Sequence, residues 1–402
     1  MDTPLYTVGQ FCEAYPPVMD GVANVLMNYV SNLRKMNVDA RSIVSGSEAD
    51  VESDRDAGDF HVLRARLYPL PGMKPYGAVS YPRRFRKALD DINFDIVHAH
   101  EPAFLGRLAY KIARKRNIPF VITFHTQIKD DIKSVVKSTW MTEKILSMGM
   151  KIYDKADEVW VPSKEALDVI RSYGYQGPAT IMMNCTDFVP PDDTLYASMR
   201  DTGRKAYMKD SSLPLLVYLG QQSVKKNIPF FLDALASIAR DGDEFEMLMV
   251  GEGPDKKSFE TYVEAHGLGK KVHFLGRITD REKVKTVLAS SDVMIFPSLY
   301  DVASIAIREA AAYRLPVIGI EGSCTSSIIE NGKNGYLSAN DRQAFISLLR
   351  HAIREPEERA RLGLSARDTI YHSWAEVVGV VDERYRSLIN GYRSRQGKAP
   401  LV

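Results

Sequence analysis

The chain has 402 residues, which at about 100–200 residues per domain predicts two domains, or three at most. With 45% hydrophobic and 26% charged residues, it has the composition of an ordinary globular protein rather than of a disordered, collagen-like or disulfide-rich chain. The 53 Lys and Arg against 51 Asp and Glu leave a net charge of +2. No chain-wide basic field, and therefore no nucleic-acid partner, is expected.

The three cysteines, Cys12, Cys185 and Cys324, lie far apart and form no Cys-x-x-Cys pair. This usage predicts a reducing compartment and argues against a disulfide framework or a structural zinc site. No apolar run reaches the 18 residues of a membrane span, and the first residues do not resemble a signal peptide. We therefore expect a cytoplasmic protein.

Short β-rich apolar runs alternate with helical patterns, which is typical of a parallel sheet built from βαβ units. Two of the helical stretches are expected at 22–35 and 106–116. The expected strands of the first half are 6–8, 40–44, 96–98, 120–124, 158–161 and 180–183.

A polar segment, 188–210, interrupts this alternation and contains two prolines followed by two aspartates. The alternation then resumes, which predicts two doubly wound domains of about 1–188 and 189–374. A last helical stretch is expected at about 375–392. The expected strands of the second half are 215–219, 246–250, 272–275, 293–296 and 317–320.

Ligands of open α/β sheets bind beyond the carboxyl ends of the strands, so residues that follow strands are the candidates for chemistry. Lys225 and Lys226 follow one strand, and a helix is expected to begin near Ser304 after another. The backbone N–H groups and the positive dipole end of that helix suit a diphosphate. Glu309, on the same helix, could accept hydrogen bonds from ribose hydroxyls.

Other motifs are weaker. Gly251 and Gly253 resemble half of a dinucleotide fingerprint, but a tight turn between strand and helix explains them as well. His98 and His100 lie on one face of a strand, yet no nearby Cys or third His completes a metal site. P-loop, α/β-hydrolase and zincin motifs are absent from the sequence.

In order and spacing, a larger set of motifs resembles the retaining glycosyltransferases of family four over nearly the whole chain. The motifs are FCEAYPPVMDGV (11–22), FDIVHAHE (94–101), FHT (124–126), ADEVWVPS (156–163), GQQSVKK (220–226), VGEGP (250–254), FLGR (274–277) and the block from Asp301 to Glu309. The resemblance implies an α/β chain of the GT-B fold, in which two Rossmann-like, doubly wound parallel-sheet domains face each other across a crevice. It also implies that the C-terminal helix, 375–402, crosses back onto the first domain.

The resemblance implies a role for each matching position. His125 would contact the transferred sugar, Lys226 would bind the phosphates, and Asp301 would contact sugar hydroxyls. The mechanism would be front-face, with the leaving diphosphate deprotonating the acceptor hydroxyl and without a metal, a cofactor or an obligatory enzyme nucleophile.

The remaining positions would bind the nucleotide-diphosphate sugar. Gly21 belongs to a glycine loop that approaches the phosphates, and Glu309 would bind the ribose. The backbone amides of Ala303, Ser304 and Ile305 would hold the distal phosphate, and Arg277 would lie near the base. Neither the base nor the sugar is evident from the sequence.

Three positions depart from the family pattern. Gln221 replaces the usual Arg, Asp301 replaces the usual first Glu, and Ala303-Ser304 replaces the usual Phe-Gly. The loss of one positive charge that stabilises a leaving diphosphate costs about 10²–10³ in rate. Either Lys225 compensates, or the donor sits differently, or the chain is a non-catalytic relative that binds a nucleotide sugar or serves as a subunit. A sugar epimerase of the same fold should lack the Lys226 and Asp301–Glu309 pattern.

The acceptor is suggested by residues 83–144, which hold 13 Lys and Arg against 7 Asp and Glu. Within residues 128–155, lysines alternate with large apolar side chains. Such a segment can lie on an anionic membrane, or can pack on its own sheet with its lysines in water. The N-terminal half is also similar to glycolipid synthases, which favours a membrane lipid over a soluble sugar as the acceptor and a peripheral position on the cytoplasmic membrane face.

Overall fold

The computed structural model describes residues 3–18, 20–56, 61–69, 77–125, 129, 132–133, 136, 138–208, 210 and 212–401. The chain forms two compact units. Unit 1 comprises residues 1–184 and 374–402, and unit 2 comprises residues 185–373. The division at residue 185 lies three residues before the polar segment that begins at 188, and the C-terminal residues return to the first unit.

Unit 1 contains an eight-stranded sheet in the order β4-β3-β2-β1-β5-β6-β7-β8. All neighbouring strands pair in parallel except β3 and β4. The central strands are buried along nearly their whole length, as expected for a parallel sheet covered on both faces. The strands are β1 (Thr7–Cys12), β2 (Asp39–Gly46), β3 (Val62–Pro69), β4 (Gly77–Ser80), β5 (Ile96–Ala99), β6 (Phe120–Thr123), β7 (Glu158–Val161) and β8 (Thr180–Ile181).

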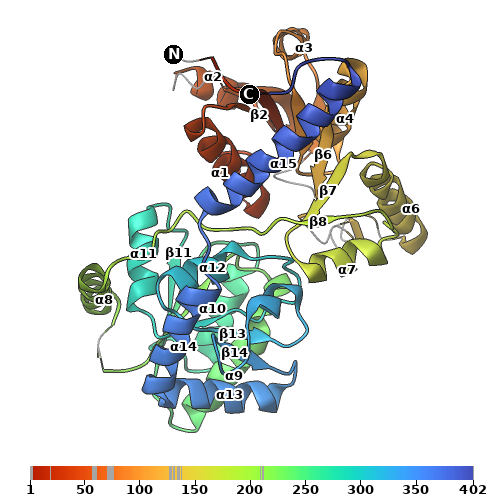
Figure 1. Ribbon diagram of the computed structural model, residues 1–402. Coiled ribbons are helices and arrows are strands. Elements are labelled where there is room, and N and C mark those ends of the chain that lie inside the picture. Colours follow the sequence, from red (N-terminus) through yellow and green to blue (C-terminus); the bar gives the residue numbers. More distant parts are fainter. Residues whose placement is uncertain are drawn as a thin grey trace. The chain divides into compact units, whose positions relative to one another are not determined.

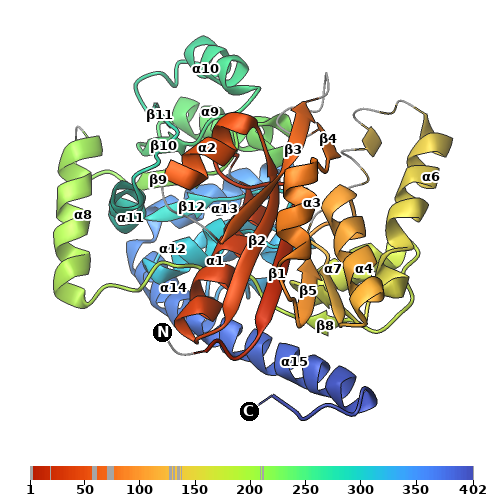
Figure 2. The same cartoon turned by 90° about the horizontal axis from the view of Figure 1, so that it is seen from above.

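The helices of unit 1 include the C-terminal helix α15 (Trp374–Arg395), which packs against α1 (Gly21–Lys35). Figures 1 and 2 both show α15 beside α1, although the two helices are far apart in the sequence. The Tyr6 hydroxyl of the first unit's core donates to Asp382 of α15 at 2.6 Å. The other helices are α2 (Glu48–Asp56), α3 (Arg83–Asp90), α4 (Phe104–Arg116), α6 (Thr139–Met150) and α7 (Lys164–Ser172).

Unit 2 contains a six-stranded parallel sheet in the order β11-β10-β9-β12-β13-β14. This is the strand order of the doubly wound nucleotide-binding folds. The strands are β9 (Leu215–Leu219), β10 (Glu246–Val250), β11 (Val272–Gly276), β12 (Val293–Ile295), β13 (Val317–Ile320) and β14 (Tyr336–Ser338). The helices are α8 (Asp193–Tyr207), α9 (Ile228–Arg240), α10 (Lys256–Ala265), α11 (Arg281–Ser290), α12 (Ile305–Ala312), α13 (Arg342–Arg354) and α14 (Pro356–Thr369).

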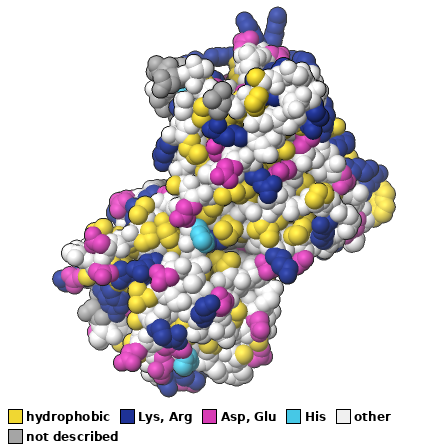
Figure 3. Space-filling view, in the orientation of Figure 1, with side chains coloured by type: hydrophobic (Ala, Val, Ile, Leu, Met, Phe, Trp, Pro, Cys, Tyr) yellow, Lys and Arg dark blue, Asp and Glu magenta, His cyan; other side chains and the backbone are white. Residues whose placement is uncertain are grey.

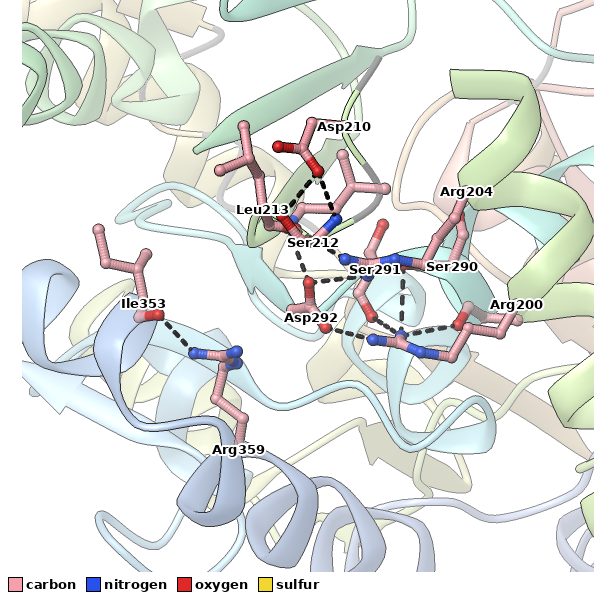
Figure 4. Close-up of polar contacts among 12 residues, drawn as sticks. Arg200, Arg204, Asp210, Ser212, Leu213, Ser290, Ser291, Asp292, Ile353 and Arg359 are labelled. Carbon is pink, nitrogen blue, oxygen red and sulfur yellow. Dashed lines mark hydrogen bonds and ion pairs between the residues drawn. The ribbon is translucent and has the colours of Figure 1, made fainter. Parts of the chain in front are cut away.

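Helix α8 is held to unit 2 by an ionic cluster in addition to the partly buried side chains of Tyr196, Met199 and Tyr207, which pack against the core. Arg200 and Arg204 donate to the carboxylate of Asp292 at 2.5 and 3.0 Å, and the backbone N–H of Leu215 donates to the same group at 2.7 Å (Figure 4). Burial opposes ionisation of Asp292, but these donors outweigh it and hold the pKa of this carboxyl below its usual value.

The predicted fold class is confirmed by these two parallel-sheet α/β domains. The predicted strands at 158–161, 215–219, 246–250 and 317–320 match the observed bounds. Strands β3, β4 and β14 were not predicted, because β4 and β14 are short strands at sheet edges and β3, next to the edge, carries a weak apolar pattern. The polar segment 188–210 was treated as a linker, but most of it forms α8, whose charged side chains stabilise it.

Candidate functional site

In unit 2, Lys226 and Asp301 lie together at the carboxyl end of the sheet. Lys226 ends a short 3₁₀ helix, Val224–Lys226, that follows β9, and Asp301 lies in the loop between β12 and α12. The ammonium group of Lys226 donates to Oδ1 of Asp301 at 2.5 Å, and the two side chains are 14% and 20% exposed. The structure thus brings together the two residues that sequence reasoning assigned separately to phosphate and sugar.

The other carboxylate oxygen of Asp301, Oδ2, is buried and receives no hydrogen bond from the described part of the chain. A buried carboxylate oxygen without a donor is costly, so such an atom is an acceptor available to a ligand hydroxyl. Tyr300 lies beside this pair, and the ammonium groups of Lys225 and Lys226 are 5.3 and 5.1 Å from the centre of its ring.

Helix α12 begins where the sequence predicted. Ser304 has the extended backbone of an N-cap, and its hydroxyl accepts a hydrogen bond from the N–H of Ala306 at 3.3 Å. The N–H of Ser304 itself donates to the Thr325 hydroxyl at 3.1 Å. Of the three amides at Ala303, Ser304 and Ile305 that were expected to hold a phosphate, that of Ser304 is therefore already engaged within the protein.

Glu309 lies on α12 and is buried. The guanidinium of Arg281, the first residue of α11, donates to its Oε1 at 2.9 Å and also pairs with Asp187. Burial nevertheless raises the pKa of the Glu309 carboxyl, although Arg281 acts in the opposite direction. A buried acid that is costly to ionise marks a candidate ligand contact.

The remaining donor-side residues of unit 2 are more accessible, since Gln221, Lys225 and Arg277 are exposed. Beneath them, the loops after β9 and β10 approach closely at two glycines. An added Cβ would lie 1.9 Å from the carbonyl oxygen of Gly220 at Gly251, and 2.1 Å from that of Gln222 at Gly253. The close approach of the two loops explains these glycines, in agreement with the tight-turn interpretation.

In unit 1, Gly21 is the first residue of α1 and is exposed, and a Cβ added there would meet nothing within 4 Å. Asp20 caps the helix by accepting from the N–H of Ala23 at 2.8 Å. A helix N-terminus with an open first position suits an anion, although the Asp20 carboxylate already satisfies one of its donors.

His125 follows β6, and its Nε2 lies 3.0 Å from Nδ1 of His100. Burial lowers the pKa of His125 to about 3, so its imidazole is neutral. His98 and His100 both have protein hydrogen-bond partners, which agrees with packing at a strand end rather than metal binding. Across the described ranges, no group of three or more metal-ligating side chains occurs.

Sequence reasoning missed several residues. Arg281 was overlooked because nothing in its local sequence links it to Glu309. Glu13 and Glu101 were quoted only as parts of motifs, yet the N–H of Glu13 donates to the Glu101 carboxylate at 3.0 Å, and burial raises the pKa of both carboxyl groups. Gln10 and Tyr385 form hydrogen bonds with His98 and His100, but no sequence pattern indicates that these residues lie close together.

The two halves of the chain match two family profiles. Residues 19–188 match the Glycosyltransferase Family 4 domain, and residues 199–369 match the domain described as Glycosyl transferases group 1. The chain therefore belongs to the family 4 glycosyltransferases. It is a glycosyltransferase of the GT-B fold that uses a nucleotide sugar.

Individual relatives are distant. The chain is 23% identical to the alpha-monoglucosyldiacylglycerol synthase of Acholeplasma laidlawii, over 89% of this chain and 91% of that protein. It is 24% identical to the sulfoquinovosyl transferase SQD2 of Arabidopsis thaliana, over 97% and 75%. Among solved structures, Anabaena HepE in complex with UDP-glucose superposes with a TM-score of 0.73 at 14% identity, over 95% of this chain and 100% of that one. Such a likeness shows the shared fold.

Proposed function

We propose that this enzyme transfers a hexose from a nucleoside diphosphate to an acceptor hydroxyl with retention of anomeric configuration, and that the acceptor is a membrane lipid. The observation that carries the donor assignment is the Asp301 carboxylate. One of its oxygens accepts from Lys226, and the other, at the loop that leads into α12, is buried and receives no hydrogen bond from any residue that the structure describes. A sugar hydroxyl would satisfy that orphan acceptor, while a phosphate would compete for Lys226.

The remaining roles are those that the family resemblance implies. Glu309 accepts from the ribose hydroxyls, and the backbone amide of Ile305, the first residue of α12, holds the distal phosphate. Arg277 lies near the base, His125 contacts the transferred sugar, and the amides of the Gly21 turn approach the phosphates. The leaving diphosphate takes the proton of the acceptor hydroxyl as the new glycosidic bond forms. The protein supplies orientation and fixed positive charge.

Helix α6 supports a lipid acceptor. One side of this helix exposes large apolar side chains around Lys144, whose ammonium lies 4.9 Å from the ring centre of Trp140. Figure 3 shows hydrophobic and basic side chains side by side at the edge where Figure 1 places α6. Exposed tryptophan and methionine with lysine suit an anionic lipid surface. The exposed apolar residues are Trp140 (69%), Met141 (47%), Ile145 (40%) and Met148 (50%).

The basic excess of residues 83–144 lies mostly on three helices, α3, α4 and α6. Part of it is neutralised, since Arg114 pairs with Asp157, and Arg116 with Asp90. Lys129 pairs with Glu143 of α6 at 2.8 Å, whereas Lys137 lies outside the described residues. No described helix is both long and apolar enough to cross a membrane.

The donor assignment is tested by thermal shift with UDP-, GDP- and ADP-sugars, since a ligand at 100 times its Kd stabilises a protein by about 2.7 kcal/mol. The best donor then enters a transfer assay with lipid and soluble acceptors, and NMR of the first product reports its anomeric configuration. We expect transfer to a lipid with retention. Gln221→Arg should transfer as fast or faster. Donor binding without any transfer, in both the natural protein and Gln221→Arg, would instead identify a non-catalytic relative.

The lipid assignment is tested by sedimentation with phosphatidylglycerol and with phosphatidylcholine vesicles. Replacing Trp140 and Met148 together by Ser should weaken binding to the anionic vesicles at least about tenfold. The matched control replaces Leu195 and Leu364, two exposed leucines of unit 2, by Ser. It should leave binding to the vesicles unchanged. Equal binding by both double variants would refute docking through α6.

A further inference from the structure

A chain of hydrogen bonds runs from His125 through the core of unit 1 and includes Tyr385 of the C-terminal helix. Its buried members are Gln10, His98, His100 and Tyr385, each no more than 1% exposed. Oε1 of Gln10 lies 2.9 Å from Nε2 of His100, and Nε2 of Gln10 donates to the Tyr385 hydroxyl at 3.0 Å. His100 then reaches His125.

The chain continues on the other side of Tyr385. Its hydroxyl oxygen lies 2.6 Å from Nδ1 of His98, and Nε2 of His98 lies 2.7 Å from the Thr123 hydroxyl. Burial raises the pKa of Tyr385 well above its usual value and lowers the pKa values of His98 and His100. The phenol therefore keeps its proton, and both histidines are neutral, with one N–H each.

Together with the orientation of the Gln10 amide in the structure, these conditions decide where every proton lies. The Gln10 carbonyl oxygen can only accept, so His100 carries its proton on Nε2 and has a lone pair on Nδ1. His125 must then donate from its Nε2 to that lone pair. Because Gln10 already donates to the Tyr385 oxygen, the phenolic O–H donates to Nδ1 of His98, which in turn donates from Nε2 to Thr123.

The ring geometry agrees with a bond between the two imidazoles. The rings of His100 and His125 are only 17° from parallel, but their centres are 5.2 Å apart. That separation is close to the 3.0 Å N–N distance plus the two ring radii, so the rings meet edge to edge. Stacked rings at van der Waals contact would be closer.

We propose that Gln10, hydrogen-bonded to Tyr385 of α15, is a positioning residue that fixes the tautomer of His125. The neutral His125 ring carries its proton on Nε2, and its remaining nitrogen, Nδ1, is an acceptor. In the proposed function, on which this consequence rests, Nδ1 accepts a hydrogen bond from a hydroxyl of the transferred sugar. Through Tyr385 and Gln10, the C-terminal helix thereby controls whether His125 presents a donor or an acceptor.

The amide of Gln10 is the element that selects this state. If the amide were turned over, its NH₂ group would face His100, and every donor and acceptor along the chain would be reversed. His125 would then carry its proton on Nδ1 and present a donor. The two states are therefore distinguishable by the protonated nitrogen of one ring.

The test is ¹⁵N NMR of the histidine rings in the full-length protein, with the His125 signal assigned by its loss in His125→Gln. We expect an N–H nitrogen at Nε2 and an unprotonated nitrogen at Nδ1. Tyr385→Phe frees the Gln10 amide, so the His125 signal should show a mixture of tautomers. In Tyr385→Phe, the kcat for transfer should fall about tenfold, while the donor KM should stay within about twofold of the natural value. A fall of this size is typical when a functional histidine loses the partner that orients it.

Tyr6→Phe is the matched control. Tyr6 is equally buried and also loses a hydroxyl bond to α15, through Asp382, but it lies outside the chain. It should alter neither the tautomer nor kcat. Gln10→Leu should reproduce Tyr385→Phe, whereas Gln10→Glu keeps an acceptor facing His100 and should retain the Nε2–H tautomer.

An Nδ1–H tautomer in the natural protein would overturn the proposal. Equal effects of Tyr385→Phe and Tyr6→Phe would overturn it as well, because they would show only a loosened helix. If the tautomer is as expected but His125→Gln transfers normally, the proposed role of His125 in the reaction fails while the assignment of its tautomer stands.

Discussion

Replacing Lys226 by Met removes one charge of the Lys226–Asp301 pair and keeps most of the side-chain stem. An exposed pair contributes about 0–1 kcal/mol and a broken buried pair costs about 3–5 kcal/mol. With side chains 14% and 20% exposed, we expect a loss of about 1–3 kcal/mol in the free energy of unfolding. If Lys226 also stabilises the leaving diphosphate, kcat should fall about 10²–10³-fold.

The double variant Lys226→Met/Asp301→Asn separates these two effects. Because it leaves no unpaired charge, it should regain most of the stability without regaining transfer. Urea unfolding and steady-state transfer are measured on both variants, with Lys257→Met as a control that removes an exposed lysine of α10. Recovery of transfer together with stability would show that Lys226 acts only structurally and would refute its assignment to the phosphate.

Three further outcomes are expected. Glu309→Gln should raise the donor KM with little change in kcat, because a ribose contact is the same in the ground and transition states; a fall in kcat alone, measured by steady-state kinetics, would contradict this. Because the pKa of Asp292 is depressed in the folded state, its carboxylate adds to the free energy of unfolding above about pH 4. This contribution is lost as the pH falls through the lower folded-state pKa. In urea unfolding between pH 3 and 6, Asp292→Asn should therefore lose less stability with acid than the natural protein. Gly253→Ala should lower the unfolding temperature, measured calorimetrically, because its Cβ would overlap the carbonyl oxygen of Gln222, whereas Gly391→Ala, in α15, adds a Cβ that meets nothing within 4 Å at a residue without a positive φ and controls for the loss of glycine.

The fold was predictable because its signals are local. The apolar runs at 215–219 and 246–250 are continuous and are followed by helical patterns, so their periodicity alone identifies buried parallel strands. Ser304 indicated the start of α12, because serine is a favoured N-cap residue. By contrast, α8 is stabilised by contacts of its arginines with Asp292, about 90 residues away, which no local pattern reveals.

The candidate site was predictable in composition but not in pairing. Lys226, Asp301 and Glu309 stand where strand ends and family motifs place them, so their positions could be read from spacing. Arg281 could not, because its link to Glu309 exists only after α11 and α12 have packed. The same holds for His98 and Tyr385, whose rings meet across 287 positions of sequence.

These pairings affect the free energy of binding a donor at the proposed site. In the free protein, Lys226 is neutralised by Asp301, and Arg281 is shared between Asp187 and Glu309. A nucleotide sugar must therefore replace internal ion pairs rather than meet unpaired charges, and its binding free energy is the difference between the two sets of contacts. If Lys226 binds the phosphates as proposed, charge that develops on the leaving diphosphate attracts it more strongly than the ground-state donor does. The exchange thus favours the transition state over the bound substrate, which is the condition for raising kcat.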